Sequence, residues 1–185
     1  MKPSDETDSQ LIKKALSGDQ AAYSQLVGRY KASLFSLTRR LSGSDDAALD
    51  LTQEAFVSAF QALGSFDPAK PFSPWLHRIA INKARDWARR RAVRRFFFGA
   101  ASMDAAVPLA SGEAGPDVAV ADALALQRTM TLVDALPHNL REVLVLRAIE
   151  DRSQADTAAL LGISEKAVET RLYRARAELR KKYEG

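Results

Sequence analysis

Cysteine is absent from this chain of 185 residues. Its absence excludes disulfide scaffolds, thiol catalysis and zinc sites built from thiolates, and it suits a reducing compartment. Long apolar runs are lacking too, because no stretch approaches the roughly 18 uncharged apolar residues of a membrane span. The beginning of the chain, Met1 to Glu6, carries no apolar signal-peptide core. We therefore expect a cytoplasmic protein with no membrane insertion of its own.

Histidine is scarce, and the two that occur, His77 and His138, lie in different halves without metal-ligand spacing. No glycine pattern matches a phosphate-binding loop. Four acidic residues close together could bind a divalent ion, but acids on one helix more often form a solvated or partner-binding face: Asp45, Asp46, Asp50 and Glu54. We expect no catalytic residues, no cofactor and no metal site, and thus a protein that is not an enzyme.

Basic residues gather in two blocks, although the net charge is only +4. Residues 78–95 contain eight Lys or Arg against one acid, and residues 166–182 contain seven against two acids. Between the blocks, residues 96–127 carry four acids and no Lys or Arg, and residues 41–69 also lack basic side chains. Two separated blocks favour two surfaces that contact a polyanion, the alternative for each being a solvated helix face.

The first half of the chain has the periodicity of an all-α bundle. Apolar residues recur at three-and-four spacing over residues 23–41, and again over 48–63, a stripe that includes Phe60. Ser44 is expected to cap the second of these helices and Gly64 to stop it. A third helix is expected from Ser73 as N-cap, with Pro74 in its first turn, and a short helix over Asp8–Ser17 precedes them all. No alternating strand pattern occurs, so we predict an N-terminal helical domain over residues 1–95.

Residues 96–118 change character and read as a flexible linker. The segment is rich in Gly, Pro, Ala and Ser, has no periodicity and is long for a loop inside a compact domain. It opens with Phe96, Phe97 and Phe98, which cannot all face one core because neighbours on a helix point about 100° apart. The cluster either packs locally or is covered differently in different states. Helical periodicity resumes near Asp122, which predicts a second domain over residues 119–185.

The last fifty residues or so contain a helix-turn-helix pattern. Ser153 is expected to cap a short first helix, Gly162 to end it in the left-handed conformation, and Ser164 to cap a second helix. The expected buried positions of that second helix are Val168, Leu172, Ala175 and Leu179. An ordinary helical hairpin is the alternative, but the basic and polar outer face of the second helix favours a helix that enters the DNA major groove.

Four stretches in this order resemble the bacterial extracytoplasmic-function (ECF) RNA polymerase sigma factors, group IV of the sigma-70 family. They are Asp50–Phe56, Phe66–Asn82, Leu136–Val143 and Gly162–Arg176. The resemblance implies, in turn, the helix that binds core RNA polymerase, the region that melts the promoter, the opening of the C-terminal domain and the recognition helix. Arg152 and Thr157 depart from the family pattern, which is usually apolar at these positions.

The resemblance also implies roles for individual residues. Asp50, Gln53 and Glu54 are expected to contact the polymerase. Expected contacts to the minus-ten element and the melted strand are Phe72, Trp75, Arg78, Asn82, Lys83, Asp86, Arg89 and Arg90, with core packing as the alternative for the tryptophans Trp75 and Trp87. Minus-35 contacts are expected from Lys166, Glu169, Thr170, Arg171, Tyr173, Arg174 and Arg176, of which Arg171 and Arg176 would meet phosphates.

The expected partners are core RNA polymerase, promoter DNA and an anti-sigma factor, which holds proteins of this kind inactive. Two other interpretations remain open at this point. A response-regulator-type activator carries a similar C-terminal helix-turn-helix, but it needs a receiver domain with alternating strands. A helical adaptor would bind proteins only and use its basic blocks as ordinary surface.

Overall fold

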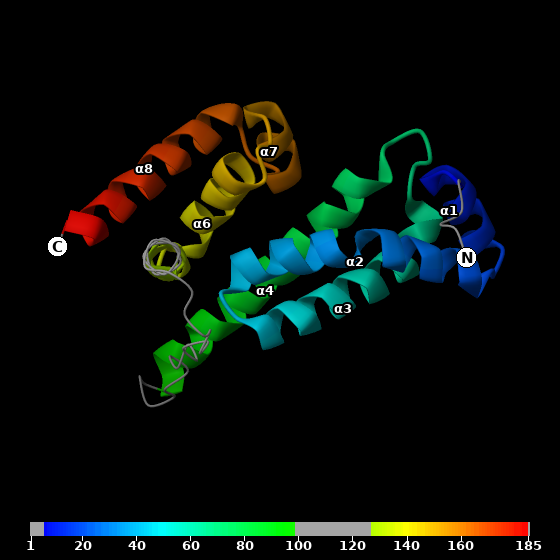
Figure 1. The fold of residues 1–185 in the computed structure, drawn as a ribbon, viewed down its shortest axis with the longest axis horizontal. Coiled ribbons are helices and arrows are strands. Elements are labelled where there is room, and N and C mark those ends of the chain that lie inside the picture. Colours follow the sequence, from blue (N-terminus) through cyan, green and yellow to red (C-terminus); the bar gives the residue numbers. More distant parts are fainter. Residues whose placement is uncertain (1–5, 99–126, 185) are drawn as a thin grey trace, which may run out of the picture.

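The computed structural model describes residues 6–98 and 127–184, and all regular structure in these two segments is helical. In the N-terminal segment, α1 (Asp8–Leu16), α2 (Gln20–Ser42), α3 (Asp45–Ala62) and α4 (Phe72–Phe98) follow one another, with the 3-10 turn η1 (Leu63–Ser65) after α3. In the C-terminal segment, helical residues 127–134 precede α6 (His138–Leu144), the π-helical turn η3 (Val145–Ile149), α7 (Gln154–Leu161) and α8 (Glu165–Glu184). The all-α, two-domain expectation is confirmed (Figure 1).

The caps of three helices lie where the sequence predicts them. The Ser44 hydroxyl accepts a hydrogen bond from the Ala47 amide at the start of α3, and Ser153 accepts one from Asp156 at the start of α7. Gly162 ends α7 with φ +66°, a left-handed conformation that costs glycine little. Ser164 accepts from the Ala167 amide at 3.2 Å and so begins α8. The helix-turn-helix is therefore built as predicted.

Several local expectations are wrong. α4 begins at Phe72, so Ser73 lies inside its first turn and is not the N-cap; its carbonyl accepts a hydrogen bond from His77 Nδ1 at 2.7 Å. The α-helical part of α3 ends at Ala62, two residues before the expected stop. Phe60 is 50% exposed, because it lies at the edge of the apolar stripe, where its ring packs against Tyr23.

α4 also extends further than the expected beginning of the linker. The helix includes residues 96–98, and residues 99–118 of that segment lie outside the described part of the chain. Phe96 and Phe97 stand 83% and 72% exposed, with their rings stacked edge to face at 5.4 Å.

The N-terminal bundle has its own apolar core. Leu11 of α1, Leu26 and Leu34 of α2, and Leu76 of α4 are essentially inaccessible to solvent and belong to one cluster. Each such leucine contributes about 1.5–3 kcal/mol relative to an exposed one. The bundle holds α3 and α4 side by side, and these are the helices that carry the expected polymerase and minus-ten residues.

A second apolar cluster joins the two segments. Leu37 and Leu41 of α2 and Ile81 of α4 pack with residues from α6, η3 and α7, among them Val143 and Leu161. Thr157, one of the two departures from the family pattern, is fully buried near this cluster and its hydroxyl has no hydrogen-bond partner in the described part. The C-terminal domain thus packs against the N-terminal bundle rather than standing apart from it (Figure 1).

No helix in the two described segments is both long enough and apolar enough to cross a membrane.

Candidate nucleic-acid and polymerase interface

One stripe of α4 carries most of the residues expected at the minus-ten element. The exposed members of this stripe follow one another at helical spacing: Arg78, Asn82, Asp86, Arg89 and Arg90. Asp86 accepts a hydrogen bond from Arg89 at 2.6 Å, one turn along the helix. Lys83 is half-buried beside the stripe. The structure therefore brings these six side chains to one side of a single helix, with four basic groups, one amide and one acid.

The aromatic residues expected to stack on melted bases form a cluster at the start of α4. Phe72 is only 6% exposed, and its ring lies 5.5 Å from both Phe66 and Trp75. Trp75 is half-buried in the same cluster, so core packing accounts for much of its surface. Trp87 likewise packs against the second cluster, with the Arg91 guanidinium 5.3 Å from its ring centre. Phe72 is therefore buried in the core. Of the two residues expected to stack on melted bases, Trp75 is the more exposed.

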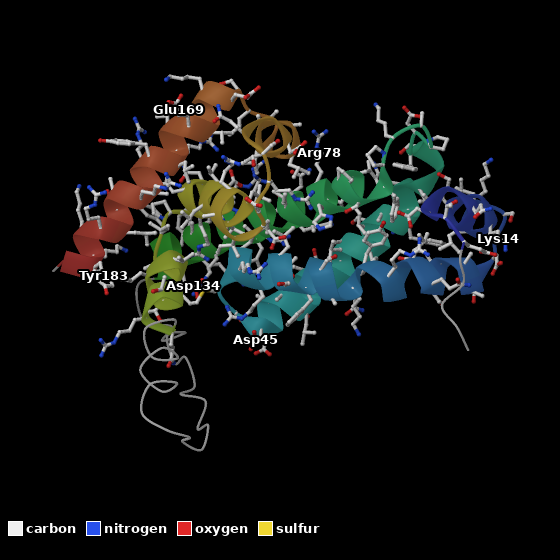
Figure 2. All side chains as sticks on the ribbon, turned by 45° about the horizontal axis from the view of Figure 1, so that its top comes forward. Lys14, Asp45, Arg78, Asp134, Glu169 and Tyr183 are labelled. Atoms are coloured by element: carbon white, nitrogen blue, oxygen red, sulfur yellow. The ribbon has the colours of Figure 1, made fainter. Side chains whose placement is uncertain are left out.

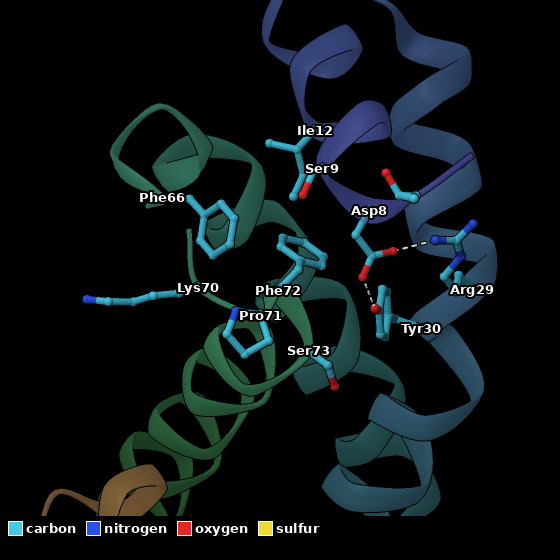
Figure 3. A pocket seen from close by; sticks show the side chains of 11 residues that line it. Asp8, Ser9, Ile12, Arg29, Tyr30, Phe66, Lys70, Pro71, Phe72 and Ser73 are labelled. Carbon is cyan, nitrogen blue, oxygen red and sulfur yellow. Dashed lines mark hydrogen bonds and ion pairs between the residues drawn. The ribbon is translucent and has the colours of Figure 1, made fainter. Parts of the chain in front are cut away.

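A hollow of about 450 Å³ opens beside this cluster, between α1, α2 and the loop before α4 (Figure 3). Phe72 and Tyr30 form part of its wall, and Lys70 lies at its rim. Asp8 accepts hydrogen bonds from both Arg29 and Tyr30 across the hollow. Burial, together with the bond to Asp8, raises the pKa of the Tyr30 hydroxyl, which therefore stays protonated.

The expected polymerase-binding residues lie together on the exposed edge of α3. Asp50, Gln53 and Glu54 border a hollow of about 400 Å³, which Lys83 of α4 closes with its ammonium 3.8 Å from the Glu54 carboxylate. Sequence reasoning missed an apolar component of this edge. Leu49, Val57 and Phe60 are each at least half exposed. The signal was present for Leu49 and Val57, which lie off the expected apolar stripe of the same helix, but not for Phe60, which the stripe includes.

α8 presents the expected base-reading residues on its outer face. Glu169, Thr170, Tyr173 and Arg174 are exposed, and Tyr173 is 75% exposed. Lys166 lies one turn earlier, with its ammonium 2.9 Å from the Glu169 carboxylate (Figure 2 labels Glu169 near the beginning of α8). Lys166 and Arg176 are exposed too, whereas the expected buried positions Val168 and Ala175 are inaccessible and Leu172 and Leu179 are partly buried.

Arg171 lies differently from the other basic residues of α8. Its side chain is 30% exposed, and its Nη1 lies 3.2 Å from Oε1 of Glu142. In this conformation Arg171 shares the Glu142 carboxylate with Arg85 of α4. The expected phosphate contact of Arg171 stays a prediction.

Sequence reasoning missed the polar contacts between the two segments, which include those of Arg85, Arg78 and Arg40. Arg85 of α4 binds Glu142 of α6 through two hydrogen bonds, at 2.7 and 2.9 Å. Arg78 donates to the Ala159 carbonyl of α7, and Arg40 of α2 pairs with Glu150. The only sequence signal was the position of Arg78 and Arg85 in a basic block, because nothing in the pattern identifies their partners.

Burial shifts several titratable groups at the contact between the segments. Desolvation lowers the pKa of His138 and of His77, although Glu142 and Glu150, respectively, act in the opposite direction. Burial raises the pKa of the Asp134 carboxyl, against the opposing effects of Arg141 and Arg39. Arg141, 7% exposed, donates to the Leu41 carbonyl at 3.0 Å and so fastens the C-terminal domain to the end of α2.

Within the described residues, no group of three or more His, Cys, Asp or Glu side chains is arranged to hold a metal ion.

Comparison with known proteins identifies the family of this chain. The family model for Sigma-70 region 2 matches residues 26–94, and the model for Sigma-70, region 4 matches residues 126–179. RNA polymerase sigma factor CnrH of Cupriavidus metallidurans is 43% identical, over 97% of this chain and 95% of that protein. ECF RNA polymerase sigma factor SigW of Bacillus subtilis is 32% identical, over 92% of this chain and 93% of that protein.

The solved structure of CnrH in complex with the cytosolic domain of CnrY is similar to this one, with a TM-score of 0.66 and 36% identity over 97% of this chain and 98% of that chain. The likeness therefore extends over both helical segments and not only over the helix-turn-helix. Relatives more than 30% identical cover nearly the whole of this chain. The chain therefore belongs to the ECF RNA polymerase sigma factors of the sigma-70 family.

Proposed function

We propose that this protein directs core RNA polymerase to specific promoters and starts transcription there. The observation that carries the proposal is the pair of polar and basic helix faces, one on α4 and one on α8, in a chain of the sigma factor family. Residues 1–95 would bind the polymerase and open the minus-ten element, residues 96–118 would link the domains, and residues 119–185 would read the minus-35 element.

The N-terminal domain supplies two adjacent surfaces for this task. The acidic edge Asp50, Gln53 and Glu54 suits a basic surface on the polymerase, and the apolar Leu49 and Val57 beside it would add contact area. The α4 stripe places cations where phosphates of the minus-ten element would run, and Trp75 offers a ring face to an unpaired base. Asn82, Lys83 and Asp86 would face the bases, with Arg89 and Arg90 on the backbone.

The C-terminal domain would read bases in the major groove with α8. A glutamate accepts a hydrogen bond from cytosine N4, and an arginine donates to guanine O6 and N7. Glu169 and Arg174 could therefore read a cytosine and a guanine, while Thr170 and Tyr173 lie between them on the same face. Lys166 and Arg176 would contact phosphates, which add affinity without sequence preference.

Two weak DNA contacts become one strong contact when both domains are tethered and docked on the polymerase. We infer that the chain has no catalytic role of its own, since RNA synthesis belongs to the core enzyme, and that it acts in the cytoplasm. We also infer regulation by an anti-sigma factor, because the similar CnrH structure is a complex with the cytosolic domain of CnrY.

Reconstitution with core polymerase tests the proposal. The purified chain should co-elute with core enzyme in size-exclusion chromatography. The mixture should also start transcripts at defined positions on DNA fragments that were selected for binding to the holoenzyme. Core enzyme alone is the control. A chain that binds core enzyme but gives no start site above that control would contradict the proposal.

A further inference from the structure

Glu142 of α6 lies between α4 and α8, the two expected DNA-reading helices, and contacts an arginine of each. Its side chain is 2% exposed, although it carries a carboxylate. Arg85 of α4 binds both of its oxygens, and Arg171 of α8 binds Oε1 at 3.2 Å. The carboxylate thus holds one arginine from each helix, and Arg85 binds it in the two-pronged geometry with which arginine also binds phosphates.

We propose that Glu142 is an intramolecular substitute for DNA phosphate, which keeps the free chain closed and occupies Arg85, from the basic block of α4, and Arg171, an expected phosphate contact of α8. A buried carboxylate is stable only while cations compensate it, so Glu142 holds both arginines firmly in the closed form. This inference rests on the proposed function, and it concerns how the same DNA-reading surfaces are regulated.

The end of α7 supports the inference independently. The last carbonyl groups of a helix have no partner within the helix and carry partial negative charge. Arg78 donates to the carbonyl of Ala159, and Arg85 donates to that of Leu161 at 3.1 Å. Arg78 and Arg85 lie two turns apart on α4, so one face of the minus-ten helix is docked on the end of the first helix of the helix-turn-helix.

Apolar packing surrounds these polar contacts. Ile81 and Ala84, between the two arginines, are fully buried, and they belong to the same cluster as Leu160 and Leu161 of α7. Separation of α7 from α4 would expose this cluster to water and would also release Arg78 and Arg85, whereas Arg171 and Glu142 belong to the same domain. Binding to polymerase and promoter DNA would have to offset both the exposure of the apolar cluster and the loss of these polar contacts. The free chain would therefore bind DNA weakly, and the holoenzyme would bind it well.

Glu142→Gln tests whether the Glu142 carboxylate keeps the chain closed, with Glu178→Gln as its matched control. Both substitutions remove one negative charge from the C-terminal domain, but Glu178 pairs with Lys181 of its own helix, at 3.7 Å, rather than with the other domain. Because the chain has no cysteine, Ala32→Cys in α2 and Tyr183→Cys in α8 allow two dyes to report the separation of the domains by energy transfer. We expect transfer in the free chain to fall for Glu142→Gln and to match the parent for Glu178→Gln.

A binding measurement without polymerase completes the test. Anisotropy of a fluorescein-labelled duplex of about 40 base pairs should show that Glu142→Gln binds about threefold or more tightly than Glu178→Gln, because apparent affinity scales with the open fraction. Unchanged energy transfer would overturn the proposal. So would an opened chain whose affinity for the duplex only equals that of the control.

Circular dichroism must first show that Glu142→Gln retains its helices. If it unfolds, Arg85→Gln takes its place in the energy-transfer measurement, since it removes the contact of Glu142 with α4 and leaves Arg171 beside the carboxylate. Transfer should again fall, and unchanged transfer would overturn the proposal. The energy-transfer measurement needs neither promoter nor polymerase, so a failure of the sigma factor proposal would show instead as absent start sites with the unaltered chain.

Discussion

At the scale of single residues, Arg174 and Arg176 of α8 are both exposed, yet the resemblance gives them different roles. We predict that Arg174→Ala weakens binding to the minus-35 element by about 1–3 kcal/mol and relaxes the base preference there. Arg176→Ala should weaken binding to all sequences alike and flatten its salt dependence. Titration of holoenzyme with matched and scrambled elements at several salt concentrations measures both. Equal losses on the two DNAs for Arg174→Ala would contradict its assignment to a base.

The two histidines should make stability depend on pH. Burial lowers the folded pKa of His77 and of His138 below the ordinary value of 6.5, so the unfolded chain binds protons more readily than the folded one. The stability that their neutral forms provide is present above pH 6.5 and is lost as the pH falls through the lower folded pKa values. We predict that urea unfolding gives a smaller free energy of unfolding at about pH 5.5 than at about pH 7.5.

His77→Gln combined with His138→Gln is the control for this prediction. The Asp134 carboxyl has a raised pKa and acts in the opposite direction, stabilising the fold as the pH falls, so the histidine effect is the difference between parent and double variant. The double variant should lose less stability over the same pH range. An identical loss in both proteins would show that the histidines are not responsible.

At the scale of elements, the turn of the helix-turn-helix depends on a left-handed residue. Gly162 has φ +66°, and no neighbouring atom lies within 4 Å of the place that an added Cβ would take, so Gly162→Ala meets backbone strain and no steric clash. We predict a loss of roughly 1–2 kcal/mol. Gly28, in the middle of α2 and equally free of neighbours, is the matched control, and Gly28→Ala should stabilise by about 0.5–1 kcal/mol. Thermal unfolding of the two variants should move in opposite directions.

The exposed edge of α3 should decide binding to the polymerase. Asp50→Arg together with Glu54→Arg is predicted to abolish holoenzyme assembly while leaving the helical content unchanged, because both side chains point into solvent. Size-exclusion chromatography with core enzyme measures assembly. The single reversal Asp67→Arg, in the loop after η1, should leave assembly intact, and normal assembly by the double variant would remove this edge from the polymerase interface.

At the scale of the whole molecule, the sequence predicts the helices better than it predicts how the two domains meet. Periodicity and caps such as Ser44, Ser153 and Gly162 act locally, within a turn or two, so sequence alone locates them. The predicted start of α4 was wrong because Ser73, a good cap in isolation, lies within the first turn where Phe72 enters the aromatic cluster.

The contacts between domains could not be predicted in the same way. Glu142 and Arg85 are 57 residues apart, and their pairing depends on how α6 docks against α4. The half-buried position of Arg171 has the same origin, because periodicity places it on α8 but cannot show that a carboxylate from another helix reaches it. The candidate residues on α3, α4 and α8 follow from local pattern and resemblance. The pairing of Arg78 and Arg171 with other groups of the same chain follows only from the fold.

Two separate helices of this chain, α4 and α8, are proposed to read two promoter elements in one complex. Holoenzyme selection from a randomised DNA library, followed by sequencing of the transcribed molecules, tests it most directly. We predict two enriched blocks at a fixed spacing, of which Arg174→Ala alters only the upstream block and Asn82→Ala only the downstream block. A single enriched block, or a change in both blocks from either variant, would contradict the account.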